Sequence, residues 1–243
     1  MKGTLYIVAT PIGNLGDITL RALETLREAD FILAEDTRVT LKLLNHYGIK
    51  KPLISYREEV HHRVFPRIVK LLQEGKRLAL VADAGTPAID DPGASIVRDL
   101  HAQGFENIVP IPGPSAVAAA FSVAGIPTQQ FFFAGYPPQK KRRKKFFEDI
   151  ARRAEPVVLF ESPHRLLKTL ENLRKTIPAR QLAVLKELTK IYECSWYGTP
   201  EEVLTALTNK QIKGEWVIIL DKSQQKIRPA RPAGGPARWQ GGS

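Results

Sequence analysis

The chain has 243 residues, 43% of them hydrophobic, a formal net charge of +11 at pH 7 and one cysteine. This length suits one large domain or two small ones, and a single cysteine excludes an internal disulfide or a cysteine-based zinc cluster. No apolar run reaches the ~20 residues that span a bilayer, and no secretory signal opens the chain, so we expect a cytoplasmic protein. The positive charge favours a polyanionic partner, namely RNA, DNA or a membrane surface.

The first half of the chain alternates short apolar runs with amphipathic segments, which predicts an open parallel sheet flanked by helices. The run Leu78–Ala82 has no polar face and is typical of a central strand buried on both sides. The predicted strands are residues 5–8, 31–34, 53–56, 78–82 and 108–111.

Three loops rich in glycine and proline follow strands of this sheet, at residues 9–17, 83–93 and 111–117. Ligands of open α/β sheets bind at the carboxyl ends of the strands, where glycine and small residues let the backbone approach a ligand closely. Asp83 is therefore either a ligand-binding acceptor or a turn residue. None of the loops is a GxGxxG or P-loop sequence, so a dinucleotide or nucleotide-phosphate site of the usual kind is not supported.

Polar residues also end the second strand, where Glu35, Asp36, Thr37 and Arg38 occur in sequence. Asp36 or Thr37 can cap the next helix, and the same segment can reach the predicted crevice. His61 and His62 are adjacent and lack the i, i+4 spacing of a helical metal pair. We interpret both as surface or RNA-facing residues, and no metal site is predicted.

The second half is predicted to begin at Gly125 and to contain strands at residues 131–134, 157–160 and 182–185. Residues 194–197 are expected to pair antiparallel with residues 216–220, and Cys194 is expected to be buried and inert. Six contiguous cations at residues 140–145 open a predicted helix. Cations at a helix N-terminus are unfavourable, so a phosphate backbone explains them better than a solvated surface does.

Seven segments spread along the chain match one family in order: VATPIGNLGDITLRALETL, AEDTR, VADAGTPAIDDPG, IPGPSAVAAAFSVAGIP, FAGYPP, ESPHRL and KELTK. Together they resemble the tetrapyrrole methylase superfamily, and within it the bacterial branch that methylates the 2′-hydroxyl of a cytidine (C1402) in 16S rRNA. The resemblance extends from about residue 3 to about residue 221. One departure is Ala82, where this branch is expected to have a serine that makes a hydrogen bond near the methyl donor.

The resemblance implies two α/β domains of the tetrapyrrole methylase type, residues 1–124 and 125–222, followed by a disordered basic tail at residues 223–243. It implies S-adenosylmethionine as methyl donor in the cleft between the domains, a homodimer, and 16S rRNA within the small ribosomal subunit as partner, with no membrane. By motif, the donor-binding residues are Ile12, Gly13, Asp83, Gly85, Thr86, Pro87, Ser115, Ala116 and Phe160.

A ribose hydroxyl must lose its proton as the methyl group arrives, and polar residues at strand ends can assist. By position, the catalytic candidates are Glu35, Asp36 and Lys186. The RNA-binding candidates are Arg38, Lys140, Lys141, Arg142, Arg143, Lys144 and Lys145. Two other functions stay open: methylation of a small tetrapyrrole, and RNA binding by a non-catalytic assembly protein.

Overall fold

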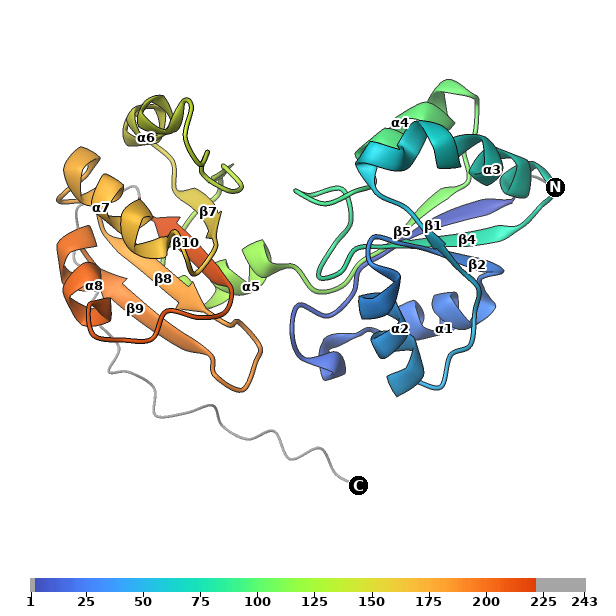
Figure 1. Ribbon diagram of the computed structural model, residues 1–243, viewed down its shortest axis with the longest axis horizontal. Coiled ribbons are helices and arrows are strands. Elements are labelled where there is room, and N and C mark those ends of the chain that lie inside the picture. Colours follow the sequence, from blue (N-terminus) through green and yellow to red (C-terminus); the bar gives the residue numbers. More distant parts are fainter. Residues whose placement is uncertain (1–2, 222–243) are drawn as a thin grey trace. The chain divides into compact units, whose positions relative to one another are not determined.

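The computed structural model describes residues 3–221, which divide into two units, Met1–Ser115 and Ala116–Ser243 (Figure 1). The prediction of two α/β domains is confirmed. The structure divides the chain after Ser115 and not after residue 124, because the helix that follows packs against a strand of the second unit. The predicted tail at residues 223–243 lies outside the described residues.

Unit 1 contains a five-stranded sheet in the order β3-β2-β4-β1-β5, with every neighbouring pair parallel. The central position of β4 agrees with its uninterrupted apolar sequence. The strands are β1 (Thr4–Val8), β2 (Phe31–Ala34), β3 (Leu53–Ser55), β4 (Arg77–Val81) and β5 (Ile108–Ile111).

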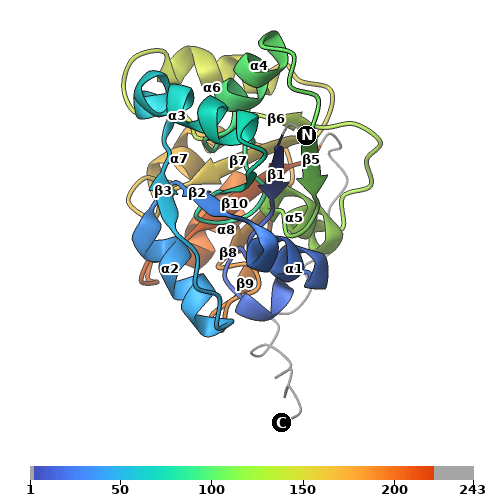
Figure 2. The same ribbon diagram turned by 90° about the vertical axis from the view of Figure 1, so that its right-hand side faces the viewer.

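Two layers of helices cover this sheet (Figure 2). Successive strand residues point to opposite faces, so Leu78 and Leu80 pack with α3 and α4, whereas Ala79 and Val81 pack with α1 and α2. The helices are α1 (Leu20–Glu28), α2 (Thr37–His46), α3 (His61–Gln73) and α4 (Ala94–Ala102), with short 3₁₀ turns at η1 (Leu15–Asp17) and η2 (Glu58–Val60).

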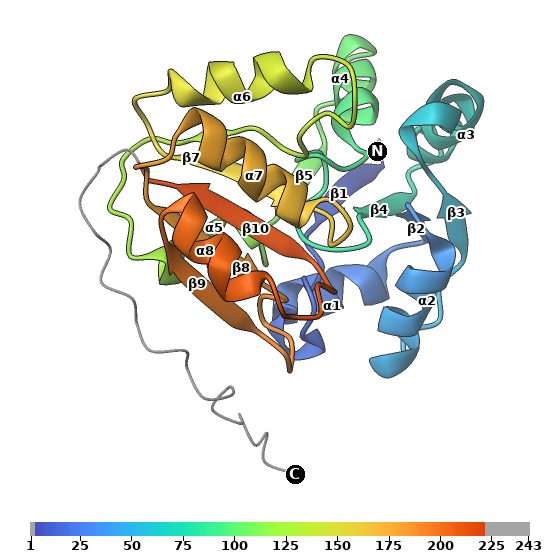
Figure 3. The ribbon, with the colours of Figure 1, turned by 60° about the vertical axis from the view of Figure 1, so that its left-hand side comes forward.

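Unit 2 contains a mixed sheet in the order β6-β7-β10-β8-β9 (Figure 3). The core between this sheet and helices α6, α7 and α8 is apolar, and helix α5 packs against β10. The strands are β6 (Phe132–Phe133), β7 (Val157–Glu161), β8 (Leu182–Lys186), β9 (Cys194–Gly198) and β10 (Trp216–Leu220), and the helices are α5 (Ala116–Ala124), α6 (Arg143–Ala151), α7 (Leu166–Thr176) and α8 (Pro200–Leu207).

Two expectations about β9 are wrong. β9 pairs antiparallel with β8, and β10 lies between β7 and β8. Apolar content identified the strands correctly, but it does not specify which strands become neighbours. Cys194 is exposed on β9 and not buried. Among residues 3–221, no helix has both the length and the apolar character that crossing a membrane requires.

His61 is a buried structural residue, so its interpretation as a surface residue is wrong. Its side chain is only 4% exposed. Its Nδ1 atom lies 2.9 Å from the hydroxyl of Tyr56, and its Nε2 atom lies 2.9 Å from a carboxylate oxygen of Asp99. The imidazole thus joins the chain after β3 to helix α4. The neighbouring His62 is exposed, as expected.

We expect His61→Ala to lower the free energy of unfolding by about 2–4 kcal/mol, because it leaves a cavity and removes the buried partner of Tyr56. His62→Ala, one residue away and exposed, should change it by less than about 0.5 kcal/mol. Urea denaturation followed by circular dichroism measures both. Equal effects of the two substitutions would contradict the structural role of His61.

Candidate functional site

Hydrogen bonds link three loops at the carboxyl edge of the unit 1 sheet. We call them the β1 loop (residues 9–14), the β4 loop (residues 82–93) and the β5 loop (residues 112–115). The amide of Thr10 donates to the carbonyl of Gly85 over 2.9 Å, and the amide of Gly85 donates back over 3.0 Å. The buried Thr10 hydroxyl also donates to the Ala82 carbonyl over 3.1 Å. The β1 and β4 loops therefore form one structural element.

The β5 loop joins this element through side-chain and backbone contacts. The hydroxyl of Thr86 donates to the carbonyl of Pro114 over 3.1 Å. Gly85 has φ +81°, and a Cβ atom there would lie 3.4 Å from the Ile12 side chain. A Cβ atom on Gly113 would lie 3.0 Å from Cβ of Ala9. Glycine at position 85 therefore suits the left-handed backbone of the β4 loop, and glycine at position 113 lets the β5 loop lie close to the β1 loop.

The predicted donor-binding residues of unit 1 lie on these three loops. Of these, Ile12, Gly85 and Pro87 are buried, Thr86 and Ser115 are half-buried, and Gly13 and Asp83 are exposed. The two remaining candidates belong to unit 2. Ala116 is the first residue of α5, and Phe160 is in β7.

The β4 loop contains strained backbone. Ala88 and Asp90 have φ values of 71° and 64°, in the left-handed region that residues with a side chain rarely occupy. The loop is closed by a hydrogen bond from the Ala88 amide to the Pro92 carbonyl over 3.2 Å. The carboxylate of Glu58 then accepts the Gly93 amide over 2.8 Å. Strained residues that surrounding contacts hold in place are typical of ligand sites.

Carboxylates from β2 and from the β4 loop meet beside these loops. Asp83 accepts the backbone amide of Asp36 over 2.9 Å, and the Glu35 carboxylate lies 3.5 Å from the Asp83 amide. Asp36 caps α2 and pairs with Arg38 at 2.5 Å. One carboxylate oxygen of Asp83 is thus already hydrogen-bonded within unit 1. The role of Asp83 in binding the methyl donor stays a prediction.

The environments of these carboxyl groups separate their acidities. Hydrogen bonds from the Arg38 side chain and backbone hold the pKa of Asp36 far below its usual range. Burial, and then the charge of Asp83, raise the pKa of Glu35. A carboxylate with a raised pKa is the better proton acceptor, so Glu35 is favoured over Asp36 as a base.

Two polar residues near this group were not singled out from the sequence. Burial, followed by the charges of Glu35, Asp90 and Asp83, raises the pKa of Asp91 to about 7. Nε of Arg57, which follows β3, donates to the Glu35 carbonyl over 3.1 Å. The only sequence signal for either was position, since both lie just after a strand or within a loop of the predicted ligand edge.

Unit 2 has a buried ionic network centred on Glu161, the last residue of β7. The Glu161 side chain is fully buried and pairs with Arg165 at 2.9 Å. Glu161 also accepts hydrogen bonds from the Ser162 amide and the Thr169 hydroxyl. Arg143 donates to Thr169 over 2.7 Å and extends the network to the start of α6.

Lys186 ends β8, with Nζ 5.8 Å from the Trp216 ring, and its catalytic role stays a prediction.

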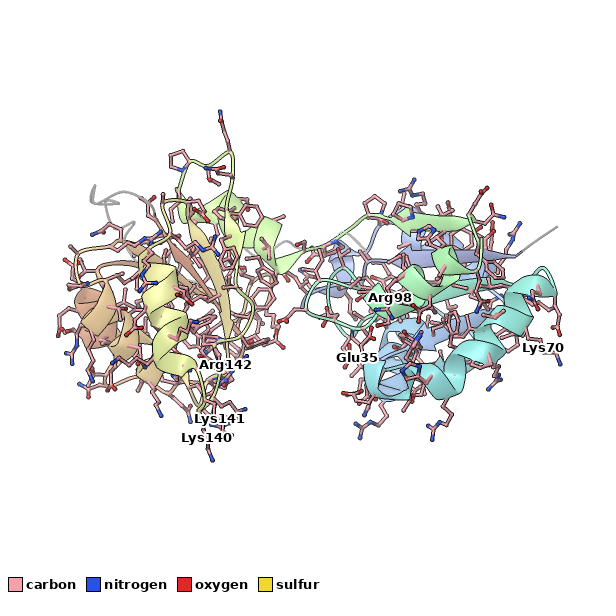
Figure 4. All side chains as sticks on the ribbon, turned by 90° about the horizontal axis from the view of Figure 1, so that it is seen from above. Glu35, Lys70, Arg98, Lys140, Lys141 and Arg142 are labelled. Carbon is pink, nitrogen blue, oxygen red and sulfur yellow. The ribbon has the colours of Figure 1, made fainter. Side chains whose placement is uncertain are left out.

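Residues 140–145 form the basic segment, which leads into α6 (Figure 4). Arg143 is 7% exposed and bound inside unit 2, so it does not present its charge to a partner as the sequence suggested. Its five neighbours in the segment are all exposed, namely Lys140, Lys141, Arg142, Lys144 and Lys145.

Within residues 3–221, no group of three or more histidine, cysteine or acidic side chains is arranged to hold a metal ion.

We expect the free energy of unfolding of Asp91→Asn to increase relative to that of the wild type as the pH rises. The folded state raises the pKa of Asp91 from 3.8 to about 7. The protonated carboxyl group of Asp91 therefore contributes stability that is fully present below about pH 4 and is lost as the pH rises through 7. Asp91 is only half-buried and solvent screens its charge, so the stability difference between variant and wild type should change by about 1 kcal/mol between pH 5 and pH 8. Urea denaturation at both pH values measures it. A pH-independent difference would contradict the shift.

Residues 4–204 match the family model Tetrapyrrole (Corrin/Porphyrin) Methylases. A protein of Neisseria meningitidis serogroup B named Ribosomal RNA small subunit methyltransferase I is 48% identical over 227 residues, covering 92% of this chain and 78% of that protein. A Thermotoga maritima protein of the same name is 44% identical over 218 residues, covering 90% of this chain and 98% of that protein.

Solved structures with the same fold are more distant. A cobalt precorrin-4 methyltransferase has a TM-score of 0.68 at 20% identity, covering 91% of this chain and 96% of that one. The uroporphyrin-III-C-methyltransferase from Thermus thermophilus has a TM-score of 0.64 at 21% identity, covering 91% of this chain and 95% of that one. The fold, the span of the family model and the close relatives agree, and this chain belongs to the tetrapyrrole methylase family.

Proposed function

We propose that this chain is an S-adenosylmethionine-dependent methyltransferase that methylates the 2′-hydroxyl of a cytidine in 16S rRNA, at C1402. The exposed basic segment carries the proposal, since a small tetrapyrrole gives no reason for five exposed cations within six residues. Support comes from relatives named Ribosomal RNA small subunit methyltransferase I at 41–48% identity. We further propose that it acts in the cytoplasm on the small ribosomal subunit and, as the family resemblance implies, as a homodimer.

The three fastened loops of unit 1 fit the proposed donor. The left-handed backbone at Gly85 and the close contact of Gly113 with Ala9 both favour glycine, which has no side chain to keep a ligand away from the loop backbone. The nearby carboxylates of Asp83 and Asp91 suit a cationic ligand. S-adenosylmethionine supplies an electrophilic methyl group, and the protein has to align it with the acceptor and exclude water.

The acceptor oxygen attacks the methyl carbon in line as the bond from carbon to sulfur breaks, and the sulfur keeps the electron pair. The proton of the ribose hydroxyl needs an acceptor. We assign this role to Glu35, because its raised pKa makes it a stronger base than Asp36. Asp91 is the alternative acceptor, with a pKa of about 7. Lys186 and the position of the donor in a cleft between the domains stay predictions.

Methyl transfer from labelled S-adenosylmethionine tests the proposal directly. The acceptors are small ribosomal subunits that lack the modification, naked 16S rRNA and a tetrapyrrole precursor, and any labelled nucleotide is then mapped. Label on a cytidine ribose supports the proposal. Label only on the tetrapyrrole assigns the chain to small-molecule methylation, and no label on any acceptor favours a non-catalytic RNA-binding protein. Either result overturns the proposal.

Glu35→Gln should lower the rate of methyl transfer by about 10²–10⁴-fold, because it removes the proton acceptor. Asp36→Asn is the matched control, since asparagine also caps a helix and the pKa of Asp36 makes it a weak base. The rate of the control should fall far less. Single-turnover kinetics measures both rates, and thermal stabilisation by S-adenosylhomocysteine should be the same in all three proteins. Equal loss in the two variants would contradict the assignment of Glu35.

Replacement of Lys140, Lys141 and Arg142 by glutamine should weaken binding to small subunits and lower the slope of log K against log salt by up to about 3. Filter binding at several salt concentrations measures the slope. The matched control replaces Lys50, Arg67 and Lys70, three exposed cations of unit 1, and removes the same charge. A slope that falls equally in both variants would show an effect of net charge and not of the basic segment.

A further inference from the structure

An exposed aromatic side chain lies on the loop that precedes the basic segment. Tyr136 follows β6, four residues before Lys140, and is 50% exposed. Its ring meets the ring of Phe160 at a centroid distance of 5.7 Å and an interplanar angle of 62°. Phe160 in turn meets Phe133 at 5.0 Å. Tyr136 is therefore the outer member of a row of three aromatic rings.

The backbone around Tyr136 is held on both sides. The carbonyl of Gly135 accepts the Phe160 amide over 3.1 Å. The carbonyl of Pro137 accepts Nη1 of Arg165 over 3.0 Å, and the carbonyl of Pro138 accepts Nη1 of Arg143 over 2.9 Å. Both arginines belong to the buried network of Glu161. Two consecutive prolines stiffen the loop further.

Arg165 also acts on the ring itself. Its guanidinium carbon lies 5.9 Å from the centroid of the Tyr136 ring, within the range of a cation–π interaction. The network thus fixes the loop and orients the ring, while half of the side chain stays accessible. A rigid, partly exposed aromatic ring loses little conformational entropy when a flat ligand stacks on it.

We propose that Tyr136 stacks on a nucleobase of single-stranded RNA whose phosphates contact the neighbouring basic segment. The inference rests on the proposed function. Proteins that bind single-stranded nucleic acid combine cations along the backbone with aromatic rings on which bases stack. Here the ring and five exposed cations lie within ten residues of one loop and the start of α6. The Glu161 network positions both, because Arg165 and Arg143 hold the carbonyls of Pro137 and Pro138.

The test uses the full chain and unmodified small ribosomal subunits in filter binding. Tyr136→Ala should weaken binding by about 5- to 100-fold and leave the salt slope unchanged, since no charge is removed. Tyr136→Phe keeps the ring and should bind like wild type. The matched control is Tyr192→Ala, which removes a 71% exposed tyrosine from another loop of unit 2. It should also bind like wild type.

Each of several results would overturn the inference. The first is wild-type affinity for small subunits in Tyr136→Ala. The others are a loss of affinity in Tyr192→Ala or in Tyr136→Phe that equals the loss in Tyr136→Ala. A changed affinity for S-adenosylhomocysteine would assign Tyr136 to the donor site, and a changed oligomeric state in sedimentation would assign it to contact with a second copy. If the wild-type chain neither binds nor methylates the subunits, the proposed function itself fails. Normal methylation with no effect of Tyr136→Ala rejects only the stacking role.

Arg165→Lys separates positioning from general stability. Lysine keeps a charge for Glu161 but cannot bridge the carboxylate and the Pro137 carbonyl in the same way. We expect weaker subunit binding in this variant, and no further weakening when it is combined with Tyr136→Ala, because both changes remove the same stacking contact. Additive losses would show that Arg165 acts independently of Tyr136 and would contradict its positioning role.

Discussion

The candidate site depends on the pair of backbone hydrogen bonds that Thr10 and Gly85 exchange. These two bonds join loops that are 75 residues apart in sequence, and the Thr86 contact to Pro114 adds the third loop. The Thr10–Gly85 pair uses backbone groups alone, whereas the side chains of Thr86 and Asp83 also have partners within unit 1. The strain at Ala88 and Asp90 persists because the surrounding contacts hold the loop in place.

Most of the fold of unit 1 could be predicted from sequence, since apolar runs and glycine or proline at their ends specify strands and loops locally. The predictions failed where a residue depends on distant partners. His61 is buried against partners that lie far away in sequence, among them the carboxylate of Asp99, 38 residues away, which accepts a hydrogen bond from Nε2 over 2.9 Å. Arg143 is buried because Thr169 lies against it. The raised pKa of Asp91 comes from burial and then from the charges of Glu35, Asp90 and Asp83, and Glu35 lies far away in sequence.

The two units use charge in opposite ways. In unit 1, carboxylates gather at the carboxyl edge of the sheet, and burial raises the pKa of Glu35, Asp83, Asp90 and Asp91. In unit 2, one buried carboxylate organises two arginines, while the neighbouring cations stay exposed. A buried ion pair adds little net stability compared with apolar packing. The Glu161 network is therefore better understood as a device that specifies the geometry of the loop at residues 135–138.

The exposure of Cys194 has a practical consequence. The sequence contains one cysteine, and it lies at the surface on β9, whose described neighbour in the sheet is β8. A maleimide dye would therefore attach to a single known position of unit 2 without any engineered substitution. Fluorescence from that position provides a reporter for events in unit 2 in the otherwise unaltered chain.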